Sequence, residues 1–122
     1  MGAKTKLFII LFSLIFAWGC EKEEIILTND PIVITLESGE EYTYDFKISG
    51  DEEGATIISQ AKHAEISEII RNESTNWSVV YRYIPQSGFI GTDSVKIETF
   101  TGSDGCACGT TNQVSFHFTV TN

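Results

Sequence analysis

Two cysteines separated by a single residue are the most reactive feature of this sequence. Cys106 and Cys108 enclose Ala107, and a glycine stands on each side of these three residues. In an oxidising compartment such thiols pair or bind metal, although a Cys-x-Cys disulfide closes a small, strained ring. We expect a disulfide that clips this loop, with reduced or intermolecularly paired thiols and a soft-metal site as the alternatives. Zinc needs four ligands at other spacings and is not predicted.

The remaining ionisable residues do not form a pattern that predicts catalysis. A nucleophilic Ser or Cys needs a base within reach and a third group to orient it, and neither of the two histidines lies near a glycine-rich nucleophile turn. Seventeen acidic residues include no pair that the sequence selects for glycoside hydrolysis. Asp51, Glu52 and Glu53 offer oxygen ligands for Ca²⁺ without the spacing of a calcium loop, so we expect a solvated loop. We therefore predict a protein that is not an enzyme and needs no cofactor.

The composition describes one acidic globular domain. The chain has 122 residues, a formal charge of −9 and a pI near 4.5. Because phosphate backbones are bound by basic patches, this charge argues against nucleic acid as a partner. Hydrophobic residues make up 42% of the chain, which is too many for a disordered tail and enough for one modest core.

The first 19 residues have the pattern of a cleaved leader. Lys4 and Lys6 form a short basic start, and an apolar run from Leu7 to Trp18 follows, broken only by Ser13. The run is shorter than the roughly 20 residues that span a bilayer, and it has no polar face of the kind that a helix at the surface of a globular domain shows. This order of basic, apolar and small residues predicts a secretory signal.

The end of this leader carries a resemblance to a known class. Ala17-Trp18-Gly19-Cys20 resembles the lipobox of bacterial lipoproteins, which implies a signal peptide over 1–19, cleavage before Cys20 and an acyl anchor on the Cys20 sulfur. Glu21-Lys22-Glu23-Glu24 resembles the export signal of surface lipoproteins of the Bacteroidetes. That resemblance implies that residues 20–30 tether the domain to the outer face of the outer membrane. A solvated acidic tether on the periplasmic face is the alternative.

From residue 31 onward, apolar and polar residues alternate. Because side chains on a strand alternate between its faces, each run predicts a strand with one buried side. We expect strands at 31–36, 41–48, 55–60, 63–70, 75–84, 93–100 and 112–121, although 55–71 is also compatible with a short helix. The pattern predicts an all-β domain over residues 31–122, an immunoglobulin-like antiparallel β-sandwich of about seven strands. Its largest core side chains are expected to be Phe46, Trp77, Phe116 and Phe118.

One segment in the second half also carries a resemblance. It is similar to the Y-x-P-x-x-G-F-x-G-T-D-S signature of bacterial Ig-like and cadherin-like repeats. The matching residues are Tyr83, Pro85, Gly88, Phe89, Gly91, Thr92, Asp93 and Ser94. We expect Pro85 to end a strand, Phe89 to plug one end of the sandwich, and Asp93 to accept hydrogen bonds from loop N–H groups. Gly88 and Gly91 are expected to take positive φ where the loop reverses. These are structural roles, so the signature predicts a fold and not a reaction.

Ser94 is also a candidate site of modification. Asp93-Ser94-Val95 is similar to the sites at which Bacteroidetes attach O-glycans, which makes Ser94 a candidate for glycosylation.

The order of the strands predicts an orientation of the domain. If strand direction alternates, the acidic loop after residue 48 and the Cys-x-Cys loop share the end at which the first strand starts. We therefore expect both loops to face the membrane and the loop at 88–93 to point outward.

The expected function is that of a lipid-anchored Ig-like module on the cell envelope that binds, adheres or serves as an accessory subunit. Its expected partners are the membrane, through the lipid, and another envelope protein or a glycan. One alternative is a periplasm-facing structural or assembly lipoprotein. The other is a redox or soft-metal protein that uses Cys106 and Cys108.

Overall fold

The computed structural model describes residues 30–102 and 109–122. The predicted signal peptide, Cys20, most of the tether and the Cys106-Ala107-Cys108 segment lie outside the described residues. None of the helices among the described residues is both long and apolar enough to cross a membrane.

Seven strands and one short 3-10 helix make up the described domain. The strands are β1 (Ile32–Glu37), β2 (Tyr42–Asp45), β3 (Gly54–Ser59), β4 (Ala64–Ile70), β5 (Val80–Pro85), β6 (Gly91–Thr101) and β7 (Thr110–Thr121), and the helix is η1 (Glu73–Thr75). The predicted all-β fold is therefore confirmed. The ambiguous stretch 55–71 contains most of β3 and the whole of β4, joined by a turn, and no helix.

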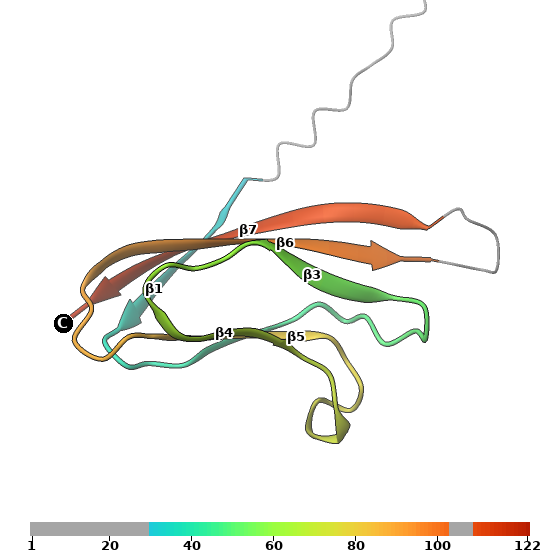
Figure 1. The fold of residues 1–122 in the computed structure, drawn as a ribbon, viewed down its shortest axis with the longest axis horizontal. Helices are drawn as coiled ribbons and strands as arrows, with labels where there is room; N and C mark the ends of the chain where they lie inside the picture. Colours follow the sequence, from blue (N-terminus) through green and yellow to red (C-terminus); the bar gives the residue numbers. More distant parts are fainter. Residues whose placement is uncertain (1–29, 103–108) are drawn as a thin grey trace, which may run out of the picture.

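The strands form two packed sheets, as the sandwich prediction requires. One sheet has the order β1-β7-β6-β3 and the other the order β2-β5-β4 (Figure 1). β3 and β4 follow one another in sequence but lie in different sheets, which is the immunoglobulin-like arrangement. The predicted antiparallel pairing holds for four of the strand pairs and fails for one, since β1 runs parallel to β7. Strands of the same parity run the same way in an alternating chain, so these two can pair only in parallel.

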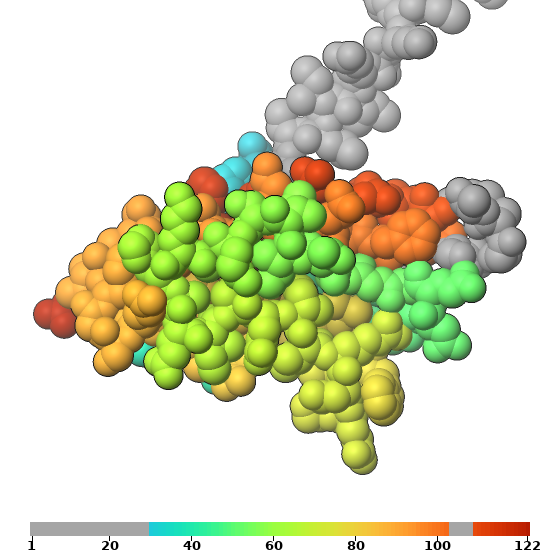
Figure 2. Space-filling model, in the orientation of Figure 1, coloured from blue at the N-terminus to red at the C-terminus, as the bar shows by residue number. Residues whose placement is uncertain are grey.

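The core lies between the sheets and is largely aromatic. Tyr81 and Tyr83 of β5 face Phe116 and Phe118 of β7, and all four side chains are fully buried. Tyr83 stacks on Phe118 with 3.9 Å between ring centroids. Figure 2 shows the side of the molecule on which β4 and the loop before it cover this core. The predicted core residues of β7 are therefore correct.

Trp77 is the clearest error of the sequence analysis. It was expected in the core as part of a strand over 75–84, but it is 58% exposed and β5 begins only at Val80. Asn76 and Trp77 both adopt left-handed backbone conformations, with φ of 52° and 60°. Two such residues reverse the chain after η1, so the alternation of faces cannot extend back through them. β2 also ends earlier than predicted, at Asp45, and Lys47 has a φ of 59°. Phe46 is half-buried and packs against the core.

The loops gather at two opposite ends of the sandwich. The loops at 46–53 and 71–79 lie at the end where β6 stops and β7 starts, while those at 38–41, 60–63 and 86–90 lie toward the other end with Asn122 (Figure 1). This is the arrangement that alternating strand direction predicts. β1 starts alongside the middle of β7, because Ile32 pairs with Phe116. The orientation relative to a membrane stays a prediction.

Candidate functional site: a polar groove on the four-stranded sheet

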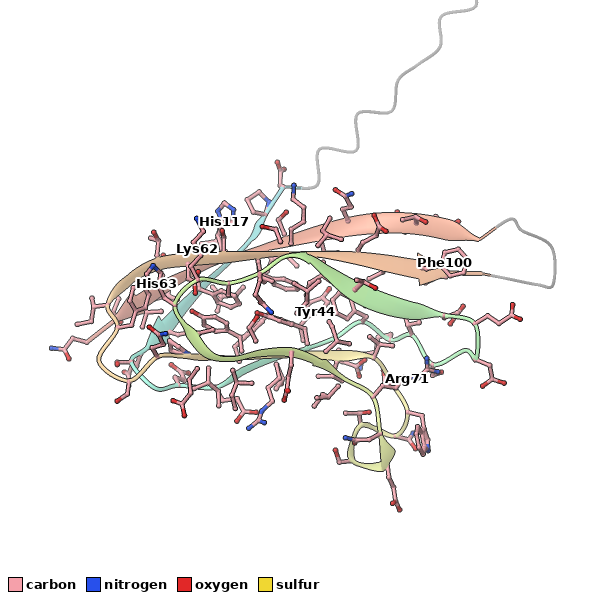
Figure 3. The ribbon with its side chains drawn as sticks, viewed as in Figure 1. Tyr44, Lys62, His63, Arg71, Phe100 and His117 are labelled. Carbon is pink, nitrogen blue, oxygen red and sulfur yellow. The ribbon has the colours of Figure 1, made fainter. Side chains whose placement is uncertain are left out.

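A groove of about 580 Å³ lies on the outer face of the four-stranded sheet. His117 is at its centre, since register places it between Val33 of β1 and Ser94 of β6. The turn between β3 and β4 closes one side with Lys62 and His63. Figure 3 shows Lys62, His63 and His117 gathered in one part of the molecule. The groove therefore combines side chains from the four strands of this sheet and the turn between β3 and β4.

The groove is lined mainly by polar groups. Hydroxyl groups come from four residues, Ser59, Thr92, Ser94 and Thr119. None of these four hydroxyls has a hydrogen-bond partner among the residues that the structure describes. Val33 is the exposed apolar residue of the lining, with 69% of its surface accessible. Such a surface offers free donors and acceptors rather than apolar contact area.

Asp93 fixes the groove from below. Its carboxylate is buried and accepts N–H groups of Lys62 and His63 at 2.9 Å each, the Ser94 N–H at 2.9 Å and the Tyr83 hydroxyl at 3.0 Å. One side chain thus joins the turn before β4, the start of β6 and the core. Since a buried carboxylate with four donors is held in one position, the groove wall is held there too.

The other signature residues shape the loop between β5 and β6. Pro85 is the last residue of β5, and Gly88 and Gly91 have φ of 82° and 144°. The Phe89 ring is half-buried and stacks on the His63 imidazole, with 4.3 Å between centroids and an angle of 6°. Phe89 therefore packs against the wall of the groove. Thr92 and Ser94 are exposed on the groove side of β6.

The unpaired cations of the described domain gather around the groove. Lys47 pairs with a carboxylate at 3.1 Å, Arg82 pairs with two, and Arg71 donates to four backbone carbonyls. By contrast, the side-chain amines of Lys62 and Lys96 contact no carboxylate within the described ranges. Lys96 follows Ser94 by two residues and so faces the same side of β6.

The acidic loop predicted to be solvated is partly built into the structure. The Glu53 carboxylate accepts the N–H groups of Gly102 and Gly50, each at 3.0 Å, and these bonds lower the pKa of Glu53. Asp51 and Glu52 are exposed beside a second hollow of about 400 Å³. No three His, Cys, Asp or Glu side chains in 30–102 and 109–122 are placed to hold a metal ion.

Arg71 ties this loop to the loop before β5. Its guanidinium donates at 2.8–2.9 Å to the carbonyls of Ser49, Gly50, Glu53 and Trp77 (Figure 3). At the neck of the Cys-x-Cys loop, the Phe100 ring lies directly over Gly109, where a Cβ would come within 2.1 Å of it. Arg71 and Phe100 thus hold this end of the sandwich together by structural contacts. The cysteines themselves lie outside the described residues.

Sequence reasoning missed the groove, although one signal was present. His117 was expected to point outward, and it does. Ser94 and Lys96 occupy the outward-facing positions of the alternating pattern in β6, so the sequence alone was enough to place them on one face. Lys62 and His63 were not linked to that face, because their position depends on the hydrogen bonds to Asp93.

The fold and the groove together define a small immunoglobulin-like β-sandwich with an open polar site on one sheet. No family model matches the chain, and no curated protein matches it. Among solved structures, an endo-fucoidan hydrolase of glycoside hydrolase family 107 is similar at 16% identity and a TM-score of 0.35. The match covers 74% of this chain and 13% of that chain. A likeness this distant carries no information about function.

Proposed function

We propose that this protein is a lipid-anchored Ig-like module of the bacterial cell envelope that binds or adheres without catalysis. The observation that carries the proposal is the open polar groove around His117, built on a rigid sheet and fixed by Asp93. An open groove on a sheet face suits recognition, whereas catalysis needs reactive groups that converge in an enclosed site.

The histidines of the groove support a binding role. A general base is oriented by a hydrogen-bonded partner and lies within reach of a nucleophile. Over the described ranges, neither the His63 nor the His117 imidazole has a hydrogen bond to a carboxylate or hydroxyl group. Asp93, the acidic residue nearest to them in the lining, is occupied by four donors.

The resemblance of residues 17–20 to a lipobox supports the anchor. Metabolic labelling with a radioactive fatty acid in the native host should mark the wild-type chain and leave Cys20→Ser unlabelled. An inhibitor of the lipoprotein signal peptidase should cause the uncleaved precursor to accumulate. An unlabelled wild-type protein, or one that keeps Met1 when mature, would contradict the proposal.

Surface exposure separates this proposal from a periplasm-facing assembly lipoprotein. Protease added to intact cells should remove the domain if it stands on the outer face, and lysed cells provide the positive control. Proteases cut exposed loops rather than packed strands, so a protease site inserted at Gly39, an exposed turn residue with open space around it, gives a defined cleavage point in the folded domain. Protection in intact cells with cleavage after lysis would place the partner in the periplasm.

A further inference from the structure

The groove presents positive charge on an otherwise acidic protein. The chain carries a formal charge of −9 with histidine counted as neutral. Within residues 30–102 and 109–122, the two lysines whose amines contact no carboxylate lie on or beside this one face, together with both histidines. Lys96 is diagonal to His117 across the β6–β7 ladder, and Lys62 comes from the turn above them. Such a local reversal of charge favours an anionic ligand.

The acidic groups near the groove do not oppose such a ligand directly. The Asp93 carboxylate is 7% exposed and is surrounded by the four donors already described. Glu98 lies farther along β6 and accepts the Gln113 side-chain amide at 3.4 Å. The acidic residue of the groove lining, Asp93, is therefore already occupied by hydrogen-bond donors.

The rest of the lining favours a small polar ligand over a folded protein. A stable protein interface buries roughly 800 Å² per partner and has an apolar centre. Here four hydroxyls without a partner among the described residues line the groove, and Val33 is the exposed apolar side chain. Hydroxyls in this density match the hydroxyl groups of a sugar. The volume of about 580 Å³ is in the range of sites for small ligands.

We infer that the groove around His117, Lys62 and Ser94 binds a saccharide that carries a carboxylate, namely a uronic acid unit. The carboxylate faces the amines of Lys62 and Lys96 and the His117 imidazole. The sugar hydroxyls face Ser94 and Thr119. This inference rests on the proposed binding function and names its ligand class.

Titration of the full chain in a non-ionic detergent tests the inference. The probes are galacturonic acid, its linear trimer, maltotriose as the neutral control and tri-glutamate as an acidic peptide. The trimer should bind saturably and shift the backbone amide NMR signals of Ser94, Lys96 and His117, and maltotriose should not. Binding of the monomer as well as the trimer assigns the site to free sugar acids, whereas binding of the trimer only assigns it to polymer segments. Both outcomes support the inference.

Matched variants locate the site. Lys62→Gln and His117→Gln should each weaken binding of the trimer by about fivefold, the effect of one charge-assisted hydrogen bond partly screened by water. Lys47→Gln makes the same change of charge as Lys62→Gln, but in the loop after β2, away from the groove. It should weaken binding of the trimer by less than about twofold. Amide spectra of the unliganded variants show whether each one is folded.

Four results of the binding experiments would overturn the inference. They are the absence of saturable binding, equal affinity for maltotriose, tighter binding of tri-glutamate than of the uronate trimer, and equal loss in Lys47→Gln and Lys62→Gln. A glycan found on Ser94 in protein from the native host would also overturn it, because the groove would then hold the protein's own sugar. None of these results affects fatty-acid labelling or protease accessibility, so failure of the inference is distinguishable from failure of the proposed anchored module.

Discussion

Tyr83 donates its hydroxyl to Oδ2 of Asp93 at 3.0 Å, and both side chains are buried. The bond joins the aromatic core to the wall of the outer groove, because the same carboxylate accepts the N–H groups of Lys62 and His63. The Tyr83 ring also stacks on Phe118, the neighbour of His117 in β7. Packing inside the sandwich thus determines where the groove residues stand outside it.

Removal of the Asp93 carboxylate should cost more than removal of the Tyr83 hydroxyl. Asp93→Ala removes the acceptor of three backbone N–H groups and of the Tyr83 phenol, for an expected loss of about 3 kcal/mol in the free energy of unfolding. Tyr83→Phe removes one bond and should cost about 1 kcal/mol. Urea denaturation measures both, with the exposed Asp51→Ala as a control. Equal losses in Asp93→Ala and Tyr83→Phe would contradict the assigned role.

The buried phenol of Tyr81 predicts the alkaline limit of stability. Burial raises the pKa of Tyr81 to about 12, and its hydroxyl lies 2.7 Å from Ser67 Oγ. A raised pKa means that this contribution to stability is complete below pH 10 and is lost as the pH rises from 10 toward 12. Tyr81→Phe should lose about 1 kcal/mol at neutral pH and show a shallower decline above pH 10. Thermal unfolding between pH 8 and 11.5 checks the difference between the two proteins.

Asp45 predicts an acid-dependent contribution of the opposite sign. Hydrogen bonds from the Ser78 hydroxyl and from the backbone and amine of Lys47 hold the pKa of Asp45 at about 2. The pKa in the folded protein lies below the ordinary aspartate value of 3.8, so this stabilisation is present above pH 4 and is lost as the pH falls toward 2. The stability of Asp45→Asn should therefore approach that of the wild type as the pH drops through this window.

Urea midpoints from pH 2 to 6 measure this convergence. Asp51→Asn is the matched control, because Asp51 is exposed and makes no hydrogen bond within the described residues. The difference in urea midpoint between Asp51→Asn and the wild type should stay constant from pH 2 to 6. Convergence of Asp51→Asn with the wild type to the same extent would assign the effect to net charge and not to the Asp45 contacts.

Arg71 should hold two loops in place at the end opposite the groove. Arg71→Met keeps the aliphatic stem and removes the donors to the carbonyls of Ser49, Gly50, Glu53 and Trp77. We expect a loss of about 2 kcal/mol and faster hydrogen exchange over 46–53 and 71–79. Hydrogen exchange of the Asp93 and His117 amides should change only as much as the global loss of stability requires. Uniformly faster exchange, with no excess in the two loops, would contradict a local clamp.

Local sequence patterns predicted much of the architecture. Strict alternation in β6 and β7 identified their inner faces, because a regular strand exposes every second side chain. The loop between Tyr83 and Ser94 was also predicted from the sequence, because its turn residues act within a short stretch of the chain. The predicted strand through Trp77 failed where the left-handed residues 76 and 77 broke the alternation. Asn76 is a residue type that adopts this conformation readily, whereas Trp77 is not, so the sequence carried only a partial signal.

The sequence by itself determined an acidic all-β domain behind a leader-like N-terminus, because charge, periodicity and turn chemistry are local properties of the chain. Only the tertiary structure decided the parallel pairing of β1 with β7, and only it brought Lys62, Ser94 and His117 together. These residues come from separate segments, and their proximity depends on strand register and on the buried Asp93. Register is a cooperative result of packing both sheets on one core, so a single segment cannot encode it.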